Sequence, residues 1–110
     1  MKKASLQDMI NGWFVGNFKP TVFDTDAMEI AVKRYKKGDK EGIHHHRIAT
    51  EITVIISGTV IMNKVKYKQD DIVIIEPYNA TNFMALEDVI TVVVKIPGEL
   101  NDKYNGEYIA

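Results

Sequence analysis

The sequence predicts an all-β domain, and three observations lead to that fold class. Short segments rich in β-branched and aromatic residues recur along the chain, with turn signals roughly every eight to twelve residues. Several of these segments alternate apolar and polar residues with the period of two that a strand requires. No segment between them is long enough for the crossover helices of a parallel α/β sheet. A single sandwich or barrel therefore accounts for the 110 residues, which suffice for one core but not for two.

The N-terminal residues predict one short helix before the first strand. A capping-box pattern that begins at Ser5 and a glycine at position 12 bracket a helix over about residues 5–11. The barrel, over about residues 13–96, then begins with Trp13 and Phe14, which we expect to pack internally or at a dimer interface.

The second strand, over residues 28–35, shows the clearest alternation. Its aliphatic side, Met28, Ile30 and Val32, is expected to face the core. Arg34 shares that side, so it either binds an acidic group at a pocket mouth or snorkels from the strand end. Further strands are expected at residues 43–47, 51–57, 59–62, 65–67, 72–75, 81–86 and 89–96, before a polar tail over 97–110 with little regular structure.

The strand over residues 51–57 is apolar on both sides, with Thr53 and Ile55 on one and Ile52, Val54 and Ile56 on the other. A strand of this kind is covered on both faces, by the core and by a second sheet or a second subunit. So small a chain leaves apolar surface that one barrel cannot cover, which predicts a homodimer.

Composition excludes several classes of function. A net charge of −1 provides no basic field for nucleic acid or anionic lipid. The longest apolar runs are far shorter than the roughly 20 residues of a membrane helix, and the first residues do not resemble a signal peptide, which predicts a cytoplasmic protein. Because the chain has no cysteine, any metal must be held by His, Asp, Glu or neutral oxygen ligands.

All three histidines lie together, and two of them are placed to share a ligand. On an extended segment His44 and His46 point to one face, about 7 Å apart, while His45 points away and is expected to be partly exposed. Glu51 follows His46 at an odd separation, so a turn or bulge near residues 49–50 must bring it to the same side. Two imidazoles and one carboxylate can bind a divalent first-row metal and leave positions open for substrate.

This stretch resembles the first sequence motif of the cupin superfamily. The motif runs from Gly38 through His44, His46 and Glu51 to Gly58, and every defined position is present at its spacing. The resemblance covers about residues 28–95 and implies a cupin-type double-sheet jelly-roll β-barrel that forms homodimers. It also implies that the two histidines and the glutamate bind a metal inside the barrel.

The second cupin motif is degraded at the position of its metal-binding histidine. Depending on which residues anchor the comparison, that position falls on Asn82 or on Thr81. Asn82 offers a weak neutral ligand, and water is the other candidate for the fourth position. The expected cofactor is therefore Fe, Mn, Zn or Ni, with weak binding or no binding as the alternative.

The resemblance leaves several functions open. The leading interpretation is a metal-binding cupin that acts on, or binds, a small polar organic molecule in the barrel, with Arg34, Tyr67, Met84 and Lys95 as candidate pocket residues. Alternatives are a small-molecule or carbohydrate-binding sensor with a structural or absent metal, and a module that only dimerises. The sequence shows no unambiguous general acid or base, so both interpretations, an enzyme and a non-catalytic binding protein, remain open.

Overall fold

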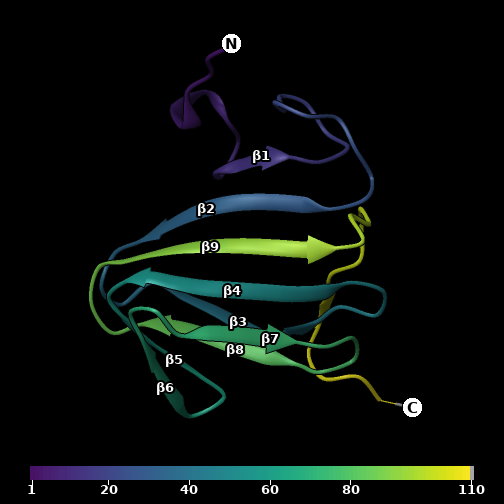
Figure 1. Cartoon of the computed structure of the whole chain (residues 1–110). Coiled ribbons are helices and arrows are strands. Elements are labelled where there is room, and N and C mark those ends of the chain that lie inside the picture. Colours follow the sequence, from purple (N-terminus) through teal and green to yellow (C-terminus); the bar gives the residue numbers. More distant parts are fainter. Residues whose placement is uncertain (110) are drawn as a thin grey trace.

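The computed structural model describes residues 1–109 and shows two antiparallel five-stranded sheets that face each other (Figure 1). One sheet has the strand order β1-β2-β9-β4-β7 and the other the order β10-β3-β8-β5-β6. The strands are β1 (Trp13–Val15), β2 (Glu29–Tyr35), β3 (Lys40–His45), β4 (Thr50–Ser57), β5 (Thr59–Met62), β6 (Val65–Lys68), β7 (Ile72–Ile75), β8 (Thr81–Ala85), β9 (Val89–Ile96) and β10 (Tyr104–Asn105). The predicted all-β, double-sheet jelly roll is confirmed.

The space between the sheets changes from apolar to polar along the strands. On β4, Ile55 belongs to the apolar core, whereas Thr53 and Glu51, two and four residues earlier on the same face, line a pocket. On β9, Val89 lies in the core and Lys95 in the pocket. Because successive inward positions of one strand serve both regions, the core holds the pocket walls in place.

The sequence-based assignment of the faces of β2 was wrong. Glu29 and Ala31 are buried, whereas Arg34, on the aliphatic side, is exposed. The inward row continues to Lys33 and Tyr35, which line the pocket. Polar side chains turn inward here because they border a polar pocket, while the aliphatic residues lie on the outer face of the sheet.

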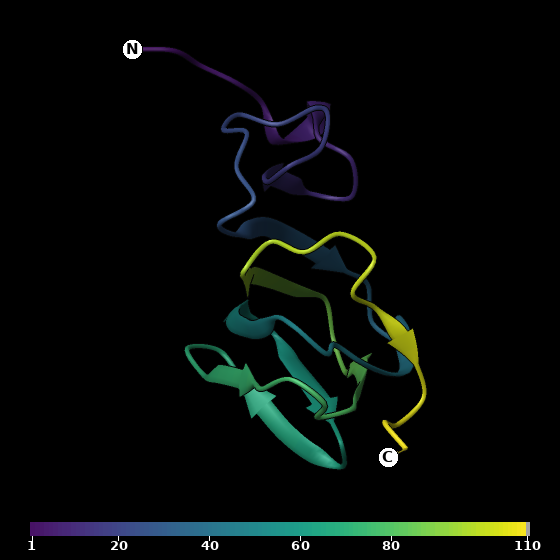
Figure 2. The ribbon, with the colours of Figure 1, turned by 90° about the vertical axis from the view of Figure 1, so that its right-hand side faces the viewer.

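The N-terminal helix is much shorter than predicted. A 3₁₀ turn, Leu6–Asp8, replaces the helix over residues 5–11. Gly12 has a φ of +81°, and a Cβ there would collide with the carbonyl oxygen of Val32, which explains why this position is a glycine. Figure 2 shows the N-terminal segment at one end of the molecule, beyond β2. No helix among residues 1–109 is long and apolar enough to span a membrane.

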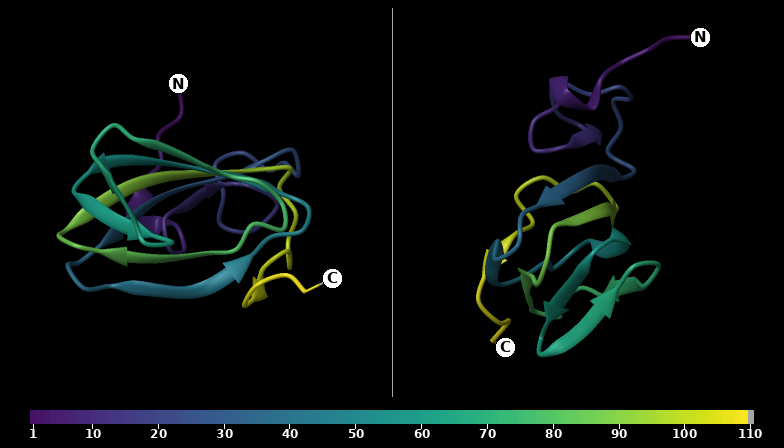
Figure 3. Two further views of the ribbon diagram at one scale, coloured as in Figure 1. Left: turned by 90° about the horizontal axis from the view of Figure 1, so that it is seen from below. Right: turned by 90° about the vertical axis from the view of Figure 1, so that its left-hand side faces the viewer.

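The C-terminal tail is more ordered than the sequence suggests. Residues Tyr104 and Asn105 form β10, which pairs with His45 and His44 of β3. Figure 3 shows this yellow segment lying along the edge of β3 in both views. The tail was expected to have little regular structure, but it extends one sheet next to the histidine motif.

Candidate functional site

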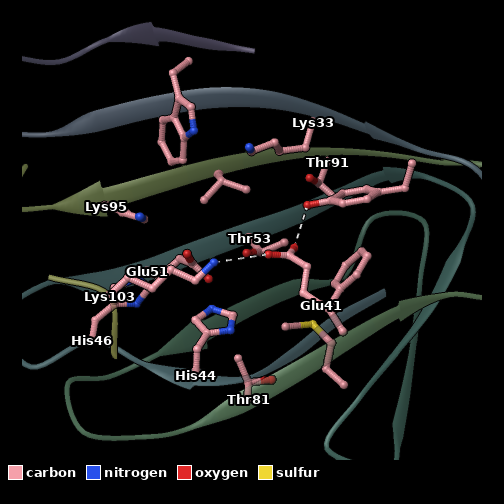
Figure 4. A pocket seen from close by; sticks show the side chains of 15 residues that line it. Lys33, Glu41, His44, His46, Glu51, Thr53, Thr81, Thr91, Lys95 and Lys103 are labelled. Atoms are coloured by element: carbon pink, nitrogen blue, oxygen red, sulfur yellow. Dashed lines mark hydrogen bonds and ion pairs between the residues drawn. The ribbon is translucent and has the colours of Figure 1, made fainter. Parts of the chain in front are cut away.

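A pocket of about 210 Å³ opens between the two sheets and gathers most of the polar residues of the interior (Figure 4). Of the residues singled out in the sequence, His44, His46, Glu51, Lys95 and the alternative Thr81 line it. These five residues therefore share one pocket, and they come from four strands and one loop.

A bulge in β3 shapes the histidine side of the pocket. Glu41 pairs with Phe83 and His44 pairs with Thr81, so three steps along β3 match two along β8. The extra residue lets Glu41 and His44 face the same side despite their odd separation, and both line the pocket. A regular strand would have pointed Glu41 outward, which is why the sequence did not reveal it.

The two inward histidines are buried and lie edge to face. Their ring centroids are 5.6 Å apart. His44 Nδ1 lies 3.0 Å from the carbonyl oxygen of Gly42; since a carbonyl can only accept, Nδ1 carries a proton, and in that neutral tautomer Nε2 would keep a lone pair. Burial, with the positive charge of Lys95 adding to it, lowers the pKa of His46 to about 4, so this ring is neutral near pH 7.

Glu51 reaches the pocket because the chain turns before β4, as predicted. Strand β3 ends at His45 and β4 begins at Thr50, so the four intervening residues reset the alternation. Burial raises the pKa of Glu51, and the nearby charge of Lys95 opposes that shift. No hydrogen bond to the Glu51 side chain is found in the described part of the chain.

His45 is buried, contrary to the prediction of partial exposure. It does point away from the pocket, but the C-terminal segment covers it: Nδ1 donates to the carbonyl oxygen of Gly106 at 2.8 Å, and Arg47 Nε donates to Nε2 at 3.1 Å. The ring also stacks on Tyr104, with centroids 5.4 Å apart. Both ring nitrogens are therefore satisfied, and His45 has a structural role.

Of the two candidates for the fourth ligand position, Thr81 lines the pocket and Asn82 does not. Thr81 is buried and faces the pocket, whereas Asn82 lies on the opposite face of β8. The Asn82 amide oxygen accepts a hydrogen bond from the backbone N–H of Asn63 at 2.7 Å. Asn82 thus holds the β5–β6 turn, and its tentative assignment as a metal ligand is corrected.

Three of the four predicted pocket residues lie elsewhere. Arg34 is exposed on the outer face of β2, Met84 is exposed on the outer face of β8, and Tyr67 packs against the apolar core. The alternation of β8 explains Met84, because Thr81, Phe83 and Ala85 take the inward positions. Of the four, only Lys95 lines this pocket.

Several pocket residues were not identified as site residues from the sequence, among them Trp13, Lys33, Tyr35, Glu41, Thr53, Thr91 and Lys103. Tyr35 donates a hydrogen bond to Glu41 Oε1 at 3.0 Å, and Lys103 Nζ lies 3.9 Å from Glu41 Oε2. The polar alternation of Lys33 and Tyr35 was a usable signal, but the aliphatic side of β2 outweighed it. Lys103 lies in a segment without any strand pattern.

The donors suit a transition metal in type but are not gathered around one point. His44 keeps a free lone pair, and His46 Nε2 is buried without a hydrogen-bond partner among the described residues, as expected of metal-ligating imidazoles. However, no three His, Asp or Glu side chains of residues 1–109 are close enough together to hold one ion. The geometry therefore supplies two candidate imidazoles and not a complete ligand set.

Comparison with solved structures supports the fold. A Klebsiella pneumoniae protein described as an uncharacterized conserved protein with a double-stranded β-helix domain has a TM-score of 0.69 at 25% identity, over 79% of this chain and 76% of that one. KdgF from Halomonas sp. has a TM-score of 0.61 at 18% identity, over 66% and 72%. A cupin-2 domain protein from Shewanella frigidimarina has a TM-score of 0.57 at 12% identity, also over 66% and 72%.

Comparison at the level of sequence adds no family or function. No family model matches the chain. No curated protein matches it either.

Proposed function

The chain has the cupin fold, and from that premise we propose that its pocket binds a small polar organic molecule. The observation that carries the proposal is a pair of buried polar atoms without hydrogen-bond partners among the described residues, His46 Nε2 and Thr91 Oγ1. Both residues line the pocket and are at most 5% exposed. An unpaired buried polar group costs about 1–3 kcal/mol. A polar ligand that supplies the missing partners would recover that cost.

The remaining pocket groups suit such a ligand. Thr53 and Thr81 add hydroxyl groups. Tyr35 and Glu41, which are hydrogen-bonded to each other, add a donor and an acceptor to the lining of the pocket. The volume of about 210 Å³ is below the roughly 300 Å³ at which pockets for drug-sized ligands begin. The expected ligand is therefore a small metabolite.

A substitution at Thr91 tests this function. Thr91→Val keeps the shape of the side chain and removes the unpaired hydroxyl, so we expect a more stable protein that binds its ligand more weakly. A library of small polar metabolites is screened by thermal unfolding, because a ligand that binds only the folded state raises the melting temperature. Failure of every compound to stabilise the wild type would contradict the proposal, as would equal stabilisation of the variant.

We also propose, as a second candidate, that His44 and His46 bind Fe, Mn, Zn or Ni, with Glu51 completing the site after a side-chain movement. The free lone pair on His44 Nε2 and the neutral state of His46 favour it. A metal in this pocket would polarise an oxygen of the bound molecule. Metal analysis of tag-free protein tests it: stoichiometric metal that His46→Ala removes would support the assignment, and metal that survives would contradict it.

We further propose that the chain forms a homodimer through the outer face of the sheet β1-β2-β9-β4-β7. Two rows of aliphatic residues cross four strands of that face, Ile30–Val94–Ile52–Ile74 and Val32–Val92–Val54–Ile72. Ile72 and Ile74 are 61% and 64% exposed. Because these rows contain no charge, the same rows of a second copy complement them.

Light scattering tests the dimer. Ile74→Lys places a charge on the exposed edge strand β7 of the face and is expected to give a monomer, because an unpaired charge is costly to bury. Met84→Lys, at an exposed site on the other sheet, is the control and should leave the mass unchanged. A monomeric wild type at micromolar concentration would contradict the proposal.

A further inference from the structure

Three lysines point into the pocket, and they define the chemistry of its ligand. We propose that Lys33, Lys95 and Lys103 bind a carboxylate group of that ligand directly, so that the pocket selects small organic acids. This inference rests on the proposed small-molecule function and specifies its substrate class. It assigns to ammonium groups of this chain the role of holding the ligand's negative charge.

Two of the three lysines have no carboxylate partner among the described residues. The one ion pair within 4.0 Å in the described part of the chain joins Lys103 to Glu41 at 3.9 Å. Lys33 and Lys95 instead place their ammonium groups over the ring of Trp13, 5.1 and 4.9 Å from its centroid. Such a contact attracts a cation but leaves its hydrogen bonds unmade. Two ammonium groups with free donors therefore share one wall of the pocket.

The charges that line the pocket do not balance. The pocket holds three lysines against Glu41 and Glu51, so it carries an excess positive charge while both carboxylates are ionised. Burial lowers the pKa of Lys33, which shows that its charge is poorly compensated where it lies. An anion between the lysines would relieve their mutual repulsion, because charges interact more strongly in a partly buried site than in water.

The two glutamates of the pocket favour a carboxylate over a phosphate. Glu41 and Glu51 line the same pocket and would repel a doubly charged phosphate more strongly than a singly charged carboxylate. Glu41 can also accept a hydrogen bond from a hydroxyl elsewhere on the ligand. The chemistry of the walls is therefore complementary to an organic acid that carries hydroxyl groups.

Lys103 has a special place because it comes from the C-terminal segment. Its side chain is 56% exposed, so its ammonium group lies toward the mouth of the pocket. The preceding residue, Asp102, is anchored to the backbone of residues 47–49, and the following residue, Tyr104, pairs with His45. The segment thus holds Lys103 where it can contact a ligand after entry.

Quenching of Trp13 fluorescence tests the inference without a known ligand. Trp13 is the single tryptophan of the chain, so its emission reports on the surroundings of Lys33 and Lys95. Iodide should quench it several-fold more than caesium in wild-type protein, and Lys33→Gln and Lys95→Gln should each reduce that ratio. The control is Lys66→Gln, which removes an exposed lysine of β6 outside the pocket. Equal ratios in wild type and pocket variants would overturn the inference.

Matched probes then test the ligand class, with EDTA present so that bound metal contributes no charge. Calorimetry compares D-glucuronate with D-glucuronamide and lactate with lactamide. We expect the acid of at least one pair to bind about ten- to a hundred-fold tighter than its amide, with the advantage lost in Lys95→Gln, since a hydrogen bond to a charged group contributes about 1.5–3 kcal/mol.

The outcomes separate this inference from the proposed function. Equal affinity for acid and amide would overturn the inference and leave the small-molecule function standing. Tighter binding of glucose 6-phosphate than of glucuronate would overturn the choice of carboxylate. If no member of either pair binds, and the metabolite screen also yields no ligand, both proposals fail.

Discussion

Replacing Asp102 by alanine is expected to release the C-terminal segment and to lower the free energy of unfolding by about 2–3 kcal/mol. The Asp102 carboxylate is buried and accepts hydrogen bonds from three consecutive backbone amides, with the shortest distances 3.0 Å from Arg47, 3.1 Å from Ile48 and 2.9 Å from Ala49. Water can reach the exposed residues Arg47 and Ile48 after the substitution. The amide of Ala49, which is 1% exposed, would keep an unsatisfied donor, and it dominates the loss.

Thermal unfolding at two pH values tests this expectation. Burial alone would raise the pKa of Asp102, but the amides of Ala49, Arg47 and Ile48 outweigh it and lower the pKa. An acid with a lowered pKa in the folded state stabilises the protein fully above its unfolded pKa of about 3.9, and this contribution is lost as the pH falls through the folded pKa. The difference in free energy of unfolding between wild type and Asp102→Ala should therefore be smaller at pH 2 than at pH 7.

The control is Glu107→Ala, which removes an exposed acid from the same segment. A loss of about 1 kcal/mol lowers the melting temperature by roughly 4–8 °C in a domain near this size, so the expected effect is readily measured. The reasoning would be refuted if Asp102→Ala behaved like Glu107→Ala at pH 7. It would also be refuted if the full difference persisted at pH 2.

Three further substitutions separate structural from functional roles. Glu51→Gln should raise stability at pH 7 by about 1 kcal/mol, because burial raises the pKa of this carboxyl and disfavours its ionised form; a lower melting temperature would contradict this. Gly58→Ala should cost about 1–3 kcal/mol in urea unfolding, because φ is +90° and a Cβ would collide with the carbonyl oxygen of Asp88, and unchanged stability would refute it. Asn82→Ala should lower the free energy of unfolding by about 1 kcal/mol, because the β5–β6 turn loses a hydrogen bond, without changing ligand affinity. Weaker ligand binding by this variant would indicate that Asn82 belongs to the binding site.

The sequence predicted the architecture well because strands and turns are encoded locally. The β-branched runs that became β4 and β9 and the glycine before β5 carry their signals within a few residues. The same holds for the pair of inward histidines, because alternation alone places His44 and His46 on one face. Both features depend on neighbouring residues and not on the tertiary arrangement.

The errors arose where tertiary contacts decide which way a side chain points. Hydrophobicity assigned the inward face of β2 to its aliphatic residues, but the interior there is polar, and Lys33 took the inward position. Alternation assigned His45 to solvent, but a segment about 60 residues later in the chain covers it. A bulge turned Glu41 inward. None of these three outcomes can be derived without knowing which strands pair.

Residues near both ends of the sequence complete the pocket around the stretch that resembles the cupin motif. The histidines and Glu51 lie within the stretch that resembles the cupin motif, whereas Trp13 and Lys103 lie outside the resemblance over residues 28–95. Trp13 brings an aromatic face to Lys33 and Lys95, and Lys103 adds an ammonium group at the mouth. The residues that set the charge of this pocket are thus partly outside the shared motif. It follows that the motif alone cannot predict the ligand, and that variants at Trp13 and Lys103 should change ligand selectivity more than they change the fold.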